Sequence, residues 1–490
     1  MIYRLRVEHL VLFYVFCLAP AAAQITVQGD SSQGSQSQSG HPPPAQYPST
    51  INLEFDMTPQ EAAHLLASVD QVIAFDSKFT GLPIRGHVER KMTSRDELKE
   101  LASKRLQDPD VAQKIQRSTA VLKKFGFVPH NFDLQKFGVE STISQLAGYY
   151  DPRVKTMYLL NWLPSVEQLP VMAHELDHAL QDQNFELQEW MKTDDPAANG
   201  PTGGDASEQH AARRAVVEGQ ATAVMIEYIL SSQGRSLMQL PVLSPDVFQG
   251  ILERASTLRT TQSAPLMMRE EMNFPYVYGL AFVHQLLLKV GKEQAFSGIF
   301  KHPPDSTRQI MEPSTYLAHE KLPPLPLPAL QEVLGKEYEK VESGSIGEFD
   351  CLTFIKQFGS TEQGKAISTN WRGDYFYAAT RASVKKSETS SGHAADLKPE
   401  DVSLVFTSRW ASPSAARAFA GFYRTTVPKR YSDARPSHTE GSQDPAQVEV
   451  WDTSEGKVTV KVEGNLVMAL ESFDEASAER VRTAVLRADK

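Results

Sequence analysis

The stretch Ala173-His174-Glu175-Leu176-Asp177-His178-Ala179-Leu180 contains two histidines four residues apart, with a glutamate directly after the first. On an α-helix, residues i and i+4 lie nearly above one another, so both imidazoles would point to the same place. This is the His-Glu-x-x-His pattern, in which the two histidines bind Zn²⁺ and the glutamate serves as a general base. We therefore predict a metal-binding helix here and interpret the rest of the chain around it.

A third metal ligand has to come from elsewhere in the chain, because a catalytic zinc site has three protein ligands and leaves a fourth position to water. Our candidate is Glu218, which lies in a predicted helix over residues 208–231 and is followed by Gly219. A glycine would let the backbone of a neighbouring helix come close at this point. His210 and Glu227, on the same predicted helix, are the alternatives.

Two carboxylates of the motif helix have predicted roles beside the metal. Glu175 would take a proton from a water molecule as general base. Asp182 lies four residues beyond His178 on the same helical face, where it could hold a ligand imidazole in the correct tautomer. A solvated surface charge is the alternative for Asp182.

A group that stabilises an oxyanion is predicted further along the chain. A phenol or an imidazolium can donate a hydrogen bond to the negative charge that develops on a carbonyl oxygen during hydrolysis. Tyr276 is our candidate, with Tyr278 and His284 as alternatives. Core packing is the other explanation for these aromatic side chains. We expect the segment 273–279, which contains a proline and a glycine, to interrupt a helical pattern over residues 245–292.

A β-hairpin is predicted directly before the motif helix. Residues 143–150 and 155–160 are short β-prone runs, and Asp151-Pro152-Arg153 between them is a turn signal. An edge strand at this place could bind an extended substrate by adding it to the sheet. A purely structural hairpin is the alternative.

The N-terminus has the features of a secretory signal peptide over residues 1–23. Arg4 and Arg6 form a positively charged region, Leu10–Leu18 an apolar run, and Ala21–Ala23 a cleavage site of small residues. The apolar run is too short for an ordinary transmembrane helix. We therefore expect an exported protein, periplasmic or secreted, without stable membrane insertion after cleavage. An uncleaved membrane anchor is the alternative.

The remaining chain is expected to form two domains of an α+β protein. Residues 24–50, rich in Ser, Gln, Gly and Pro, are typical of a disordered linker. Residues 51–343 predict a mostly helical domain with a small sheet or hairpin, which contains the metal motif. Strands and helices then follow one another, so residues 344–490 predict a small C-terminal α+β domain of unknown role.

Composition narrows the classes of partner. The chain has 490 residues, of which 41% are hydrophobic and 22% charged, as in ordinary globular proteins. Its formal net charge is −10, which argues against a nucleic-acid partner. Of the two cysteines, Cys17 would leave with the signal peptide and Cys351 would remain alone, so no internal disulfide is expected.

The motif and its surroundings resemble a known family. The helix over residues 173–183, together with the later segment Val217-Glu218-Gly219, resembles the gluzincin type of zincin metallopeptidase. The chain is more closely similar to exported bacterial proteins that share three further segments. These are an Ala-Gly-Tyr-Tyr-Asp-Pro hairpin, a Phe-Pro-Tyr segment and a Pro-Pro-x-Ser-Thr segment, here residues 147–152, 274–276 and 303–307.

The resemblance extends over residues 51–320 and implies a set of site residues. The implied zinc ligands are His174, His178 and Glu218, and the implied general base is Glu175. Two residues depart from the pattern: Asp177 places a charge inside the motif, and Arg308 stands where we expect an acidic residue.

Together these observations predict an exported zinc-dependent metallopeptidase that hydrolyses peptide bonds of peptide or protein substrates. An endopeptidase is expected, because no clear acidic anchor for a free amino terminus is evident. There are two alternatives. One is a non-catalytic envelope interaction protein with a structural or vestigial metal site, and the other is a hydrolase of peptidoglycan amides.

Overall fold

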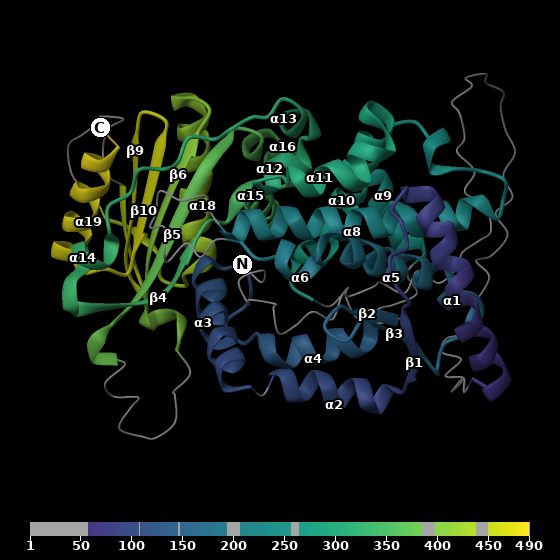
Figure 1. Ribbon diagram of the computed structural model, residues 1–490. Coiled ribbons are helices and arrows are strands. Elements are labelled where there is room, and N and C mark those ends of the chain that lie inside the picture. The colour runs from purple at the N-terminus through teal and green to yellow at the C-terminus, as the bar shows by residue number, and fades with distance from the viewer. Residues whose placement is uncertain are drawn as a thin grey trace, which may run out of the picture.

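The computed structural model describes residues 57–106, 108–145, 148–193, 206–255, 264–384, 397–437 and 449–489. The predicted signal peptide (1–23) and linker (24–50) lie outside these residues. No helix within the described ranges is long and apolar enough to cross a membrane. The fold is α+β, as predicted, with a helical part at one end and a large antiparallel sheet at the other (Figure 1).

Most helices precede the large sheet in the chain. Their bounds are α1 (Pro59–Thr80), α2 (Arg95–Leu106), α3 (Pro109–Phe125), α4 (Leu134–Gln145), α5 (Ser165–Phe185), α6 (Leu187–Trp190), α8 (Ala206–Ser231), η4 (Leu237–Gln239), α9 (Pro245–Ala255), α10 (Leu266–Glu293), η6 (Gln294–Gly298), α11 (Ile299–Lys301), α12 (Thr307–Met311), α13 (Pro313–Leu317) and α14 (Leu330–Leu334). The motif helix α5 packs against both α1 and α8, and α8 packs in turn against α10. These long helices form the core in which the metal motif lies.

Local sequence signals explain where the first helices begin and end. Thr58 accepts a hydrogen bond from the backbone N–H of Glu61, and Glu61 accepts one from the backbone N–H of Thr58, which forms a capping box at the start of α1. Gly126 ends α3 with a φ of 73°, a left-handed conformation that glycine adopts at little cost. Both boundaries therefore follow from residue types that are local in the sequence.

The predicted hairpin is present and belongs to a three-stranded sheet. Its strands are β1 (Glu89–Thr93), β2 (Gly148–Asp151) and β3 (Thr156–Leu160), in the order β1-β3-β2. β2 pairs antiparallel with β3 and lies at an edge, whereas β1 pairs parallel with β3. The first strand is shorter than predicted, because residues 143–145 belong to α4.

The predicted interruption of the helix at residues 273–279 is wrong, since α10 runs through this segment with Pro275 inside it. The reason is tertiary packing. A Cβ on Gly279 would lie 2.2 Å from the carbonyl oxygen of Ala215, and one on Gly219 would lie 2.3 Å from the carbonyl carbon of Gly279. The glycine therefore serves the close crossing of α10 with α8 and does not end the helix.

A seven-stranded antiparallel sheet dominates the C-terminal part, in the order β4-β5-β6-β10-β9-β8-β7. Its strands are β4 (Tyr338–Gly344), β5 (Trp371–Arg381), β6 (Val402–Trp410), β7 (Arg435–Pro436), β8 (Glu449–Thr453), β9 (Gly456–Glu463) and β10 (Leu466–Glu471). The helical elements here are η7 (Gly335–Glu337), α15 (Gly347–Phe358), α16 (Thr361–Ser368), η8 (Pro399–Asp401), α18 (Pro413–Arg430) and α19 (Glu475–Ala488). The sheet begins before residue 344, because β4 pairs with β5.

Helices cover both faces of this sheet (Figure 1). Successive strand residues point to opposite faces. Accordingly, Phe376 packs with α3 and α18, whereas Tyr377 belongs to the cluster that contains α14 and α19. Phe125 at the end of α3 lies 5.4 Å from Phe376 and 5.7 Å from Phe406, measured between ring centroids. Residues from both predicted domains therefore share one hydrophobic core. Cys351, on α15, is a buried free thiol in that core.

Candidate metal centre

Three side chains from two helices meet in the buried core. His174 and His178 on α5 direct their Nε2 atoms at Glu218 on α8, whose Oε2 lies 3.2 Å from the first and 3.5 Å from the second. All three residues are fully buried. Ligand atoms that surround zinc tetrahedrally at usual bond lengths are about 3.4 Å apart. The two histidines and Glu218 therefore fit a zinc ion in both chemistry and spacing.

The fold brings Glu218 to the two histidines, and not His210 or Glu227, which were the alternative third ligands. Glu227 instead accepts a hydrogen bond of 2.7 Å from the backbone N–H of Leu237. His210 lies eight residues before Glu218 on α8, which places it about 12 Å away along the helix axis, so it does not face the same point. Glu175 does lie near the histidines, but the Glu218 oxygen is within 3.5 Å of both Nε2 atoms.

The carboxyl group of Glu175 is held beside the histidines by the edge strand β2. Its Oε2 accepts a hydrogen bond of 2.7 Å from the backbone N–H of Tyr150. Its Oε1 is buried and has no hydrogen-bond partner among the described residues. Burial raises the pKa of Glu175 to about 8, which is suitable for a group that must both accept and release a proton near neutral pH.

Burial and the Glu218 carboxylate act in opposite directions on the two imidazoles. Burial lowers the pKa of His174 to about 4. For His178, the nearby Glu218 outweighs burial and raises the pKa to about 9. Burial alone would raise the pKa of Glu218, but its hydrogen bonds with both histidines lower it to about 2. The centre thus keeps an ionised carboxylate at full burial, which requires adjacent positive charge.

Asp182 does not hold a ligand imidazole, which was one of the two roles that the sequence left open for it. Asp182 accepts a hydrogen bond of 3.0 Å from the hydroxyl of Tyr150 and one of 3.2 Å from the backbone N–H of Leu187. The Nδ1 of His178 instead lies 2.9 Å from Oε1 of Gln181, a residue that the sequence analysis did not single out. Its position three residues after the second histidine, on the same face of the helix, was a usable signal.

Of the three oxyanion candidates, Tyr276 is the one placed at the centre. The centroid of its ring lies 6.1 Å from the centroid of the His174 ring. Its side chain is buried near Glu218 and Glu175. Burial, followed by the charge of Glu218, raises the pKa of Tyr276 well above its usual value. Its hydroxyl therefore stays protonated and can act as a donor. The positive charge of Arg214, one helical turn before Glu218, acts against this rise in the pKa of Tyr276, and the sequence analysis missed this residue as well.

The two alternative oxyanion candidates pack elsewhere. Tyr278 packs among core aromatic rings, with its ring centroid 5.4 Å from that of Phe274 and 5.5 Å from that of Phe349. His284 places its Nε2 3.2 Å from the carbonyl oxygen of Leu237. The packing explanation therefore applies to both of them.

The two departures from the family pattern are both buried. Asp177 is fully buried on α5, 3.1 Å from Gln181 through its Oδ2, and burial raises its pKa to about 7.

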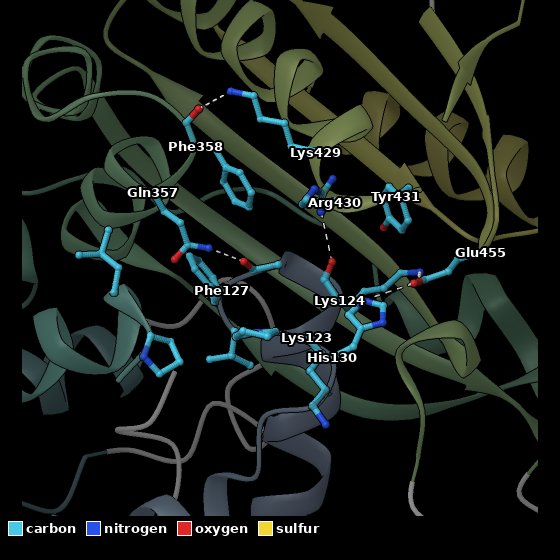
Figure 2. Close-up of a pocket in the computed structure, with 15 residues that line it drawn as sticks. Lys123, Lys124, Phe127, His130, Gln357, Phe358, Lys429, Arg430, Tyr431 and Glu455 are labelled. Carbon is cyan, nitrogen blue, oxygen red and sulfur yellow. Dashed lines mark hydrogen bonds and ion pairs between the residues drawn. The ribbon is translucent and has the colours of Figure 1, made fainter. Parts of the chain in front are cut away.

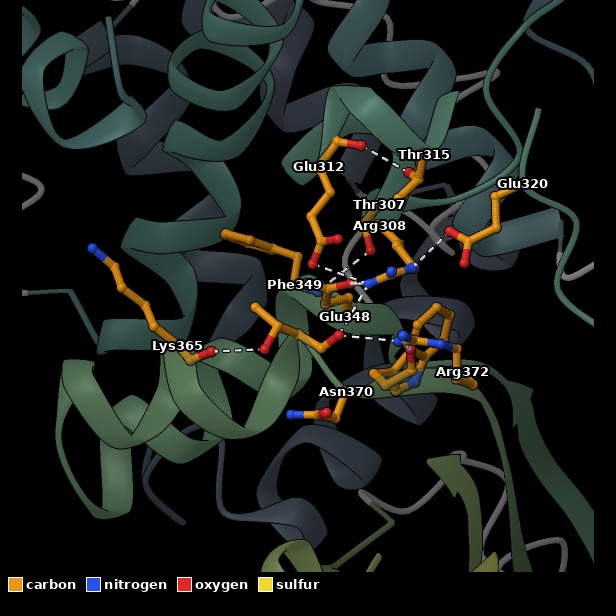
Figure 3. A network of polar contacts seen from close by, with 12 residues as sticks. Thr307, Arg308, Glu312, Thr315, Glu320, Glu348, Phe349, Lys365, Asn370 and Arg372 are labelled. Atoms are coloured by element: carbon orange, nitrogen blue, oxygen red, sulfur yellow. Dashed lines mark hydrogen bonds and ion pairs between the residues drawn. The ribbon is translucent and has the colours of Figure 1, made fainter. Parts of the chain in front are cut away.

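Arg308 begins a network between α12 and α15 (Figure 3). Its guanidinium lies 2.9 Å from Glu348 and 3.0 Å from both Glu312 and Glu320. Arg308 therefore joins the helical part to the C-terminal part and does not face the metal centre.

A separate pocket of about 340 Å³ lies between α3, α15 and the end of α18 (Figure 2). Two of its basic side chains donate hydrogen bonds to backbone carbonyl oxygens at the C-terminal ends of α15 and α3. Lys429 donates to the carbonyl oxygen of Phe358 at 2.5 Å, and Arg430 donates to that of Lys124 at 3.2 Å. Lys124 itself pairs with Glu455 at 2.7 Å. These contacts account for Lys124, Lys429 and Arg430 by capping and pairing, so the candidate metal centre remains the candidate active site.

Comparisons with known proteins bear on the C-terminal part alone. A family described as a domain of unknown function (DUF8575) matches residues 333–482, which contain the whole seven-stranded sheet and part of α19. No curated protein and no solved structure matches the chain. The matched segment includes none of the residues of the metal centre.

Proposed function

We propose that this protein is a zinc-dependent metallopeptidase with His174, His178 and Glu218 as the metal ligands. The observation that carries the proposal is the approach of both Nε2 atoms to one Glu218 oxygen at 3.2 and 3.5 Å in a fully buried site. Glu218 Oε1 and His174 Nδ1 are buried without hydrogen-bond partners in the described part of the chain. A metal ion would compensate the burial of this carboxylate.

Bound zinc would supply Lewis-acid chemistry, which lowers the pKa of water toward neutrality and polarises a carbonyl group. Glu175 accepts the proton of the attacking water and passes it to the departing amine. The hydrogen bond from Tyr150 N–H fixes one oxygen of Glu175 and leaves the other for this transfer. Tyr276 donates a hydrogen bond from its protonated hydroxyl to the oxyanion.

The edge strand β2 supports a peptide as substrate. It pairs with β3 on one side, and its other side faces Glu175 through Tyr150. An extended peptide could bind along this edge through its remaining backbone groups, while Tyr150 N–H stays bonded to Glu175, and bring its carbonyl groups next to that carboxylate. We retain the expectation of an exported endopeptidase, which follows from the N-terminal sequence and from the absence of a clear acidic anchor for a free amino terminus.

The experiment combines metal analysis with cleavage of an unbiased peptide library by the purified protein. The wild type should contain zinc, and Glu175→Gln should retain zinc but lose cleavage by about 10²- to 10⁴-fold. Glu167→Gln, on the same helix but in its first turn, is the matched control and should cleave normally. Cleavage that persists unchanged in Glu175→Gln would refute the proposal. Cleavage of peptidoglycan amides but not of peptides would favour the alternative hydrolase.

A further inference from the structure

A chain of buried side-chain amides lies behind the metal ligand His178. Gln181 on α5 places its Oε1 2.9 Å from Nδ1 of His178 and its Nε2 2.9 Å from Oε1 of Gln220 on α8. Gln220 in turn places its Nε2 2.6 Å from the carbonyl oxygen of Ala295. Both glutamines are fully buried. The chain therefore connects the metal ligand to the π-helical segment η6, which contains Ala295.

Two backbone carbonyls determine which way these amides point. A carbonyl oxygen can only accept a hydrogen bond, so the group that faces it has to be an amide NH₂. The oxygen of Val217 lies 3.1 Å from Nε2 of Gln181, and that of Ala295 lies 2.6 Å from Nε2 of Gln220. Gln220 therefore presents its oxygen to Gln181. Gln181 must present its own oxygen to His178.

The orientation of Gln181 determines the tautomer of His178. Because Oε1 of Gln181 can only accept, Nδ1 of His178 must carry the proton. When a metal ion displaces the proton of Nε2, the lone pair of this nitrogen is then directed at the place of the metal beside Glu218, while Nδ1 keeps its proton. Outer groups that hold a ligand imidazole in this way raise metal affinity by fixing both tautomer and ring orientation.

We propose that Gln181 is a positioning residue that selects the metal-binding tautomer of His178, and that Gln220 supports it. This inference rests on the proposed zinc centre. Val217 contributes independently of Gln220, because its carbonyl alone suffices to orient the Gln181 amide. The two glutamines should therefore have unequal effects on metal binding.

The test measures zinc affinity by competition with a chromophoric chelator in the full-length protein. Gln181→Leu should lower the affinity by about 10- to 100-fold. Gln220→Leu should lower it less, since Val217 still orients Gln181. The matched control is Gln168→Leu, because Gln168 is a fully buried glutamine on the same helix that hydrogen-bonds the backbone of Leu160 and Leu163. This control should lose stability but keep wild-type zinc affinity.

A spectroscopic readout separates positioning from stability. In the zinc-loaded protein with ¹⁵N-labelled histidine, wild type and Gln168→Leu should show a slowly exchanging proton on Nδ1 of His178. Gln181→Leu should lose this protection. The wild-type spectrum alone tests the tautomer, so the inference remains falsifiable even if Gln181→Leu does not fold.

The outcomes distinguish this inference from the proposed function. If Gln181→Leu binds zinc within twofold of wild type, or if wild-type His178 carries no proton on Nδ1 when loaded with zinc, the positioning role is refuted. If zinc binding depends on Gln181 as expected but no cleavage depends on Glu175, the peptidase proposal fails and the positioning role stands. A wild-type protein without zinc affinity would overturn both.

Discussion

Gly219 on α8 and Gly279 on α10 meet backbone against backbone: a Cβ built on Gly219 would lie 2.3 Å from the carbonyl carbon of Gly279. Contacts this short cannot be made by any residue with a side chain. The crossing matters for the centre because Glu218 precedes the first glycine and Tyr276 lies one helical turn before the second. The two glycines therefore set the distance between a proposed metal ligand and the proposed oxyanion donor.

Gly219→Ala should force α8 and α10 apart. Overpacking of this kind typically costs about 1–3 kcal/mol of unfolding free energy. The displacement of Glu218 should also weaken zinc binding, which we would measure together with urea denaturation. Gly421→Ala, inside α18 where an added Cβ meets nothing within 4 Å, is the control and should be neutral or slightly stabilising. An equal response of the two variants would contradict the role of the close crossing.

Zinc removal should lower the thermal stability of the protein, since a ligand that binds only the folded state stabilises it by mass action. At a free zinc concentration about 100 times the dissociation constant, the expected contribution is about 2.7 kcal/mol. Glu218→Ala should abolish most of this dependence, and its melting temperature should hardly change when a chelator is added. Glu227→Ala should remain sensitive to chelator, because Glu227 caps η4 and does not face the histidines. A chelator-sensitive Glu218→Ala protein would instead assign the third ligand elsewhere.

Asp76→Asn should stabilise the protein increasingly as pH rises. Asp76 on α1 is fully buried, neither of its carboxyl oxygens has a partner among the described residues, and burial together with Asp177 raises its pKa well above the usual value. Above the unfolded pKa of about 4, the folded state still holds the proton that the unfolded chain has released, so wild-type stability falls with rising pH. The slope reaches about 1.4 kcal/mol per pH unit for one proton.

Urea denaturation at several pH values between 4 and 8 would test the role of Asp76, with Asp70→Asn on the same helix as control. Asp70 is exposed, and its hydrogen bond with Arg90 lowers its pKa. Its contribution is therefore present above the unfolded pKa and is lost as pH falls, so the control should show a small effect of opposite sign. A pH-independent gain in Asp76→Asn would show that packing, and not charge, is responsible.

Arg308→Met should destabilise the junction between the helical and C-terminal parts. It would leave the carboxylate of Glu348, fully buried 2.9 Å from the guanidinium, without its cation. Breaking a buried ion pair from one side typically costs about 3–5 kcal/mol. Adding Glu348→Gln to the Arg308→Met variant should recover much of the loss. No recovery in the double variant would mean that Glu312 and Glu320 carry the interaction instead.

Much of the centre was visible in the sequence because helices relate residues at fixed spacings. The four-residue interval placed His174 and His178 on one face of α5, and the capping signals at Thr58 and Gly126 marked where helices begin and end. The strands and helices expected in residues 344–490 likewise indicated the α+β character of the C-terminal part. All of these are local patterns, in which the geometry of one element determines which residues lie together.

Contacts between elements were the part that sequence reasoning could not decide. It left open whether Asp182 contacts a ligand imidazole, and it kept Tyr278 and His284 as alternatives to Tyr276, because each choice depends on how helices from distant parts of the chain cross. It also expected a break in α10 where a proline and a glycine occur, whereas the glycine is needed for the approach of α8.

The sequence by itself therefore determined that the two histidines share one helical face with Glu175 beside them, and it determined the α+β class, since these follow from helical and strand periodicity. Only the tertiary structure decided that Glu218 faces both histidines, that Gln181 lies behind His178 and that α3 packs on the C-terminal sheet. The physical reason is that close packing and the satisfaction of buried polar groups depend on which surfaces meet, and no single segment contains that information.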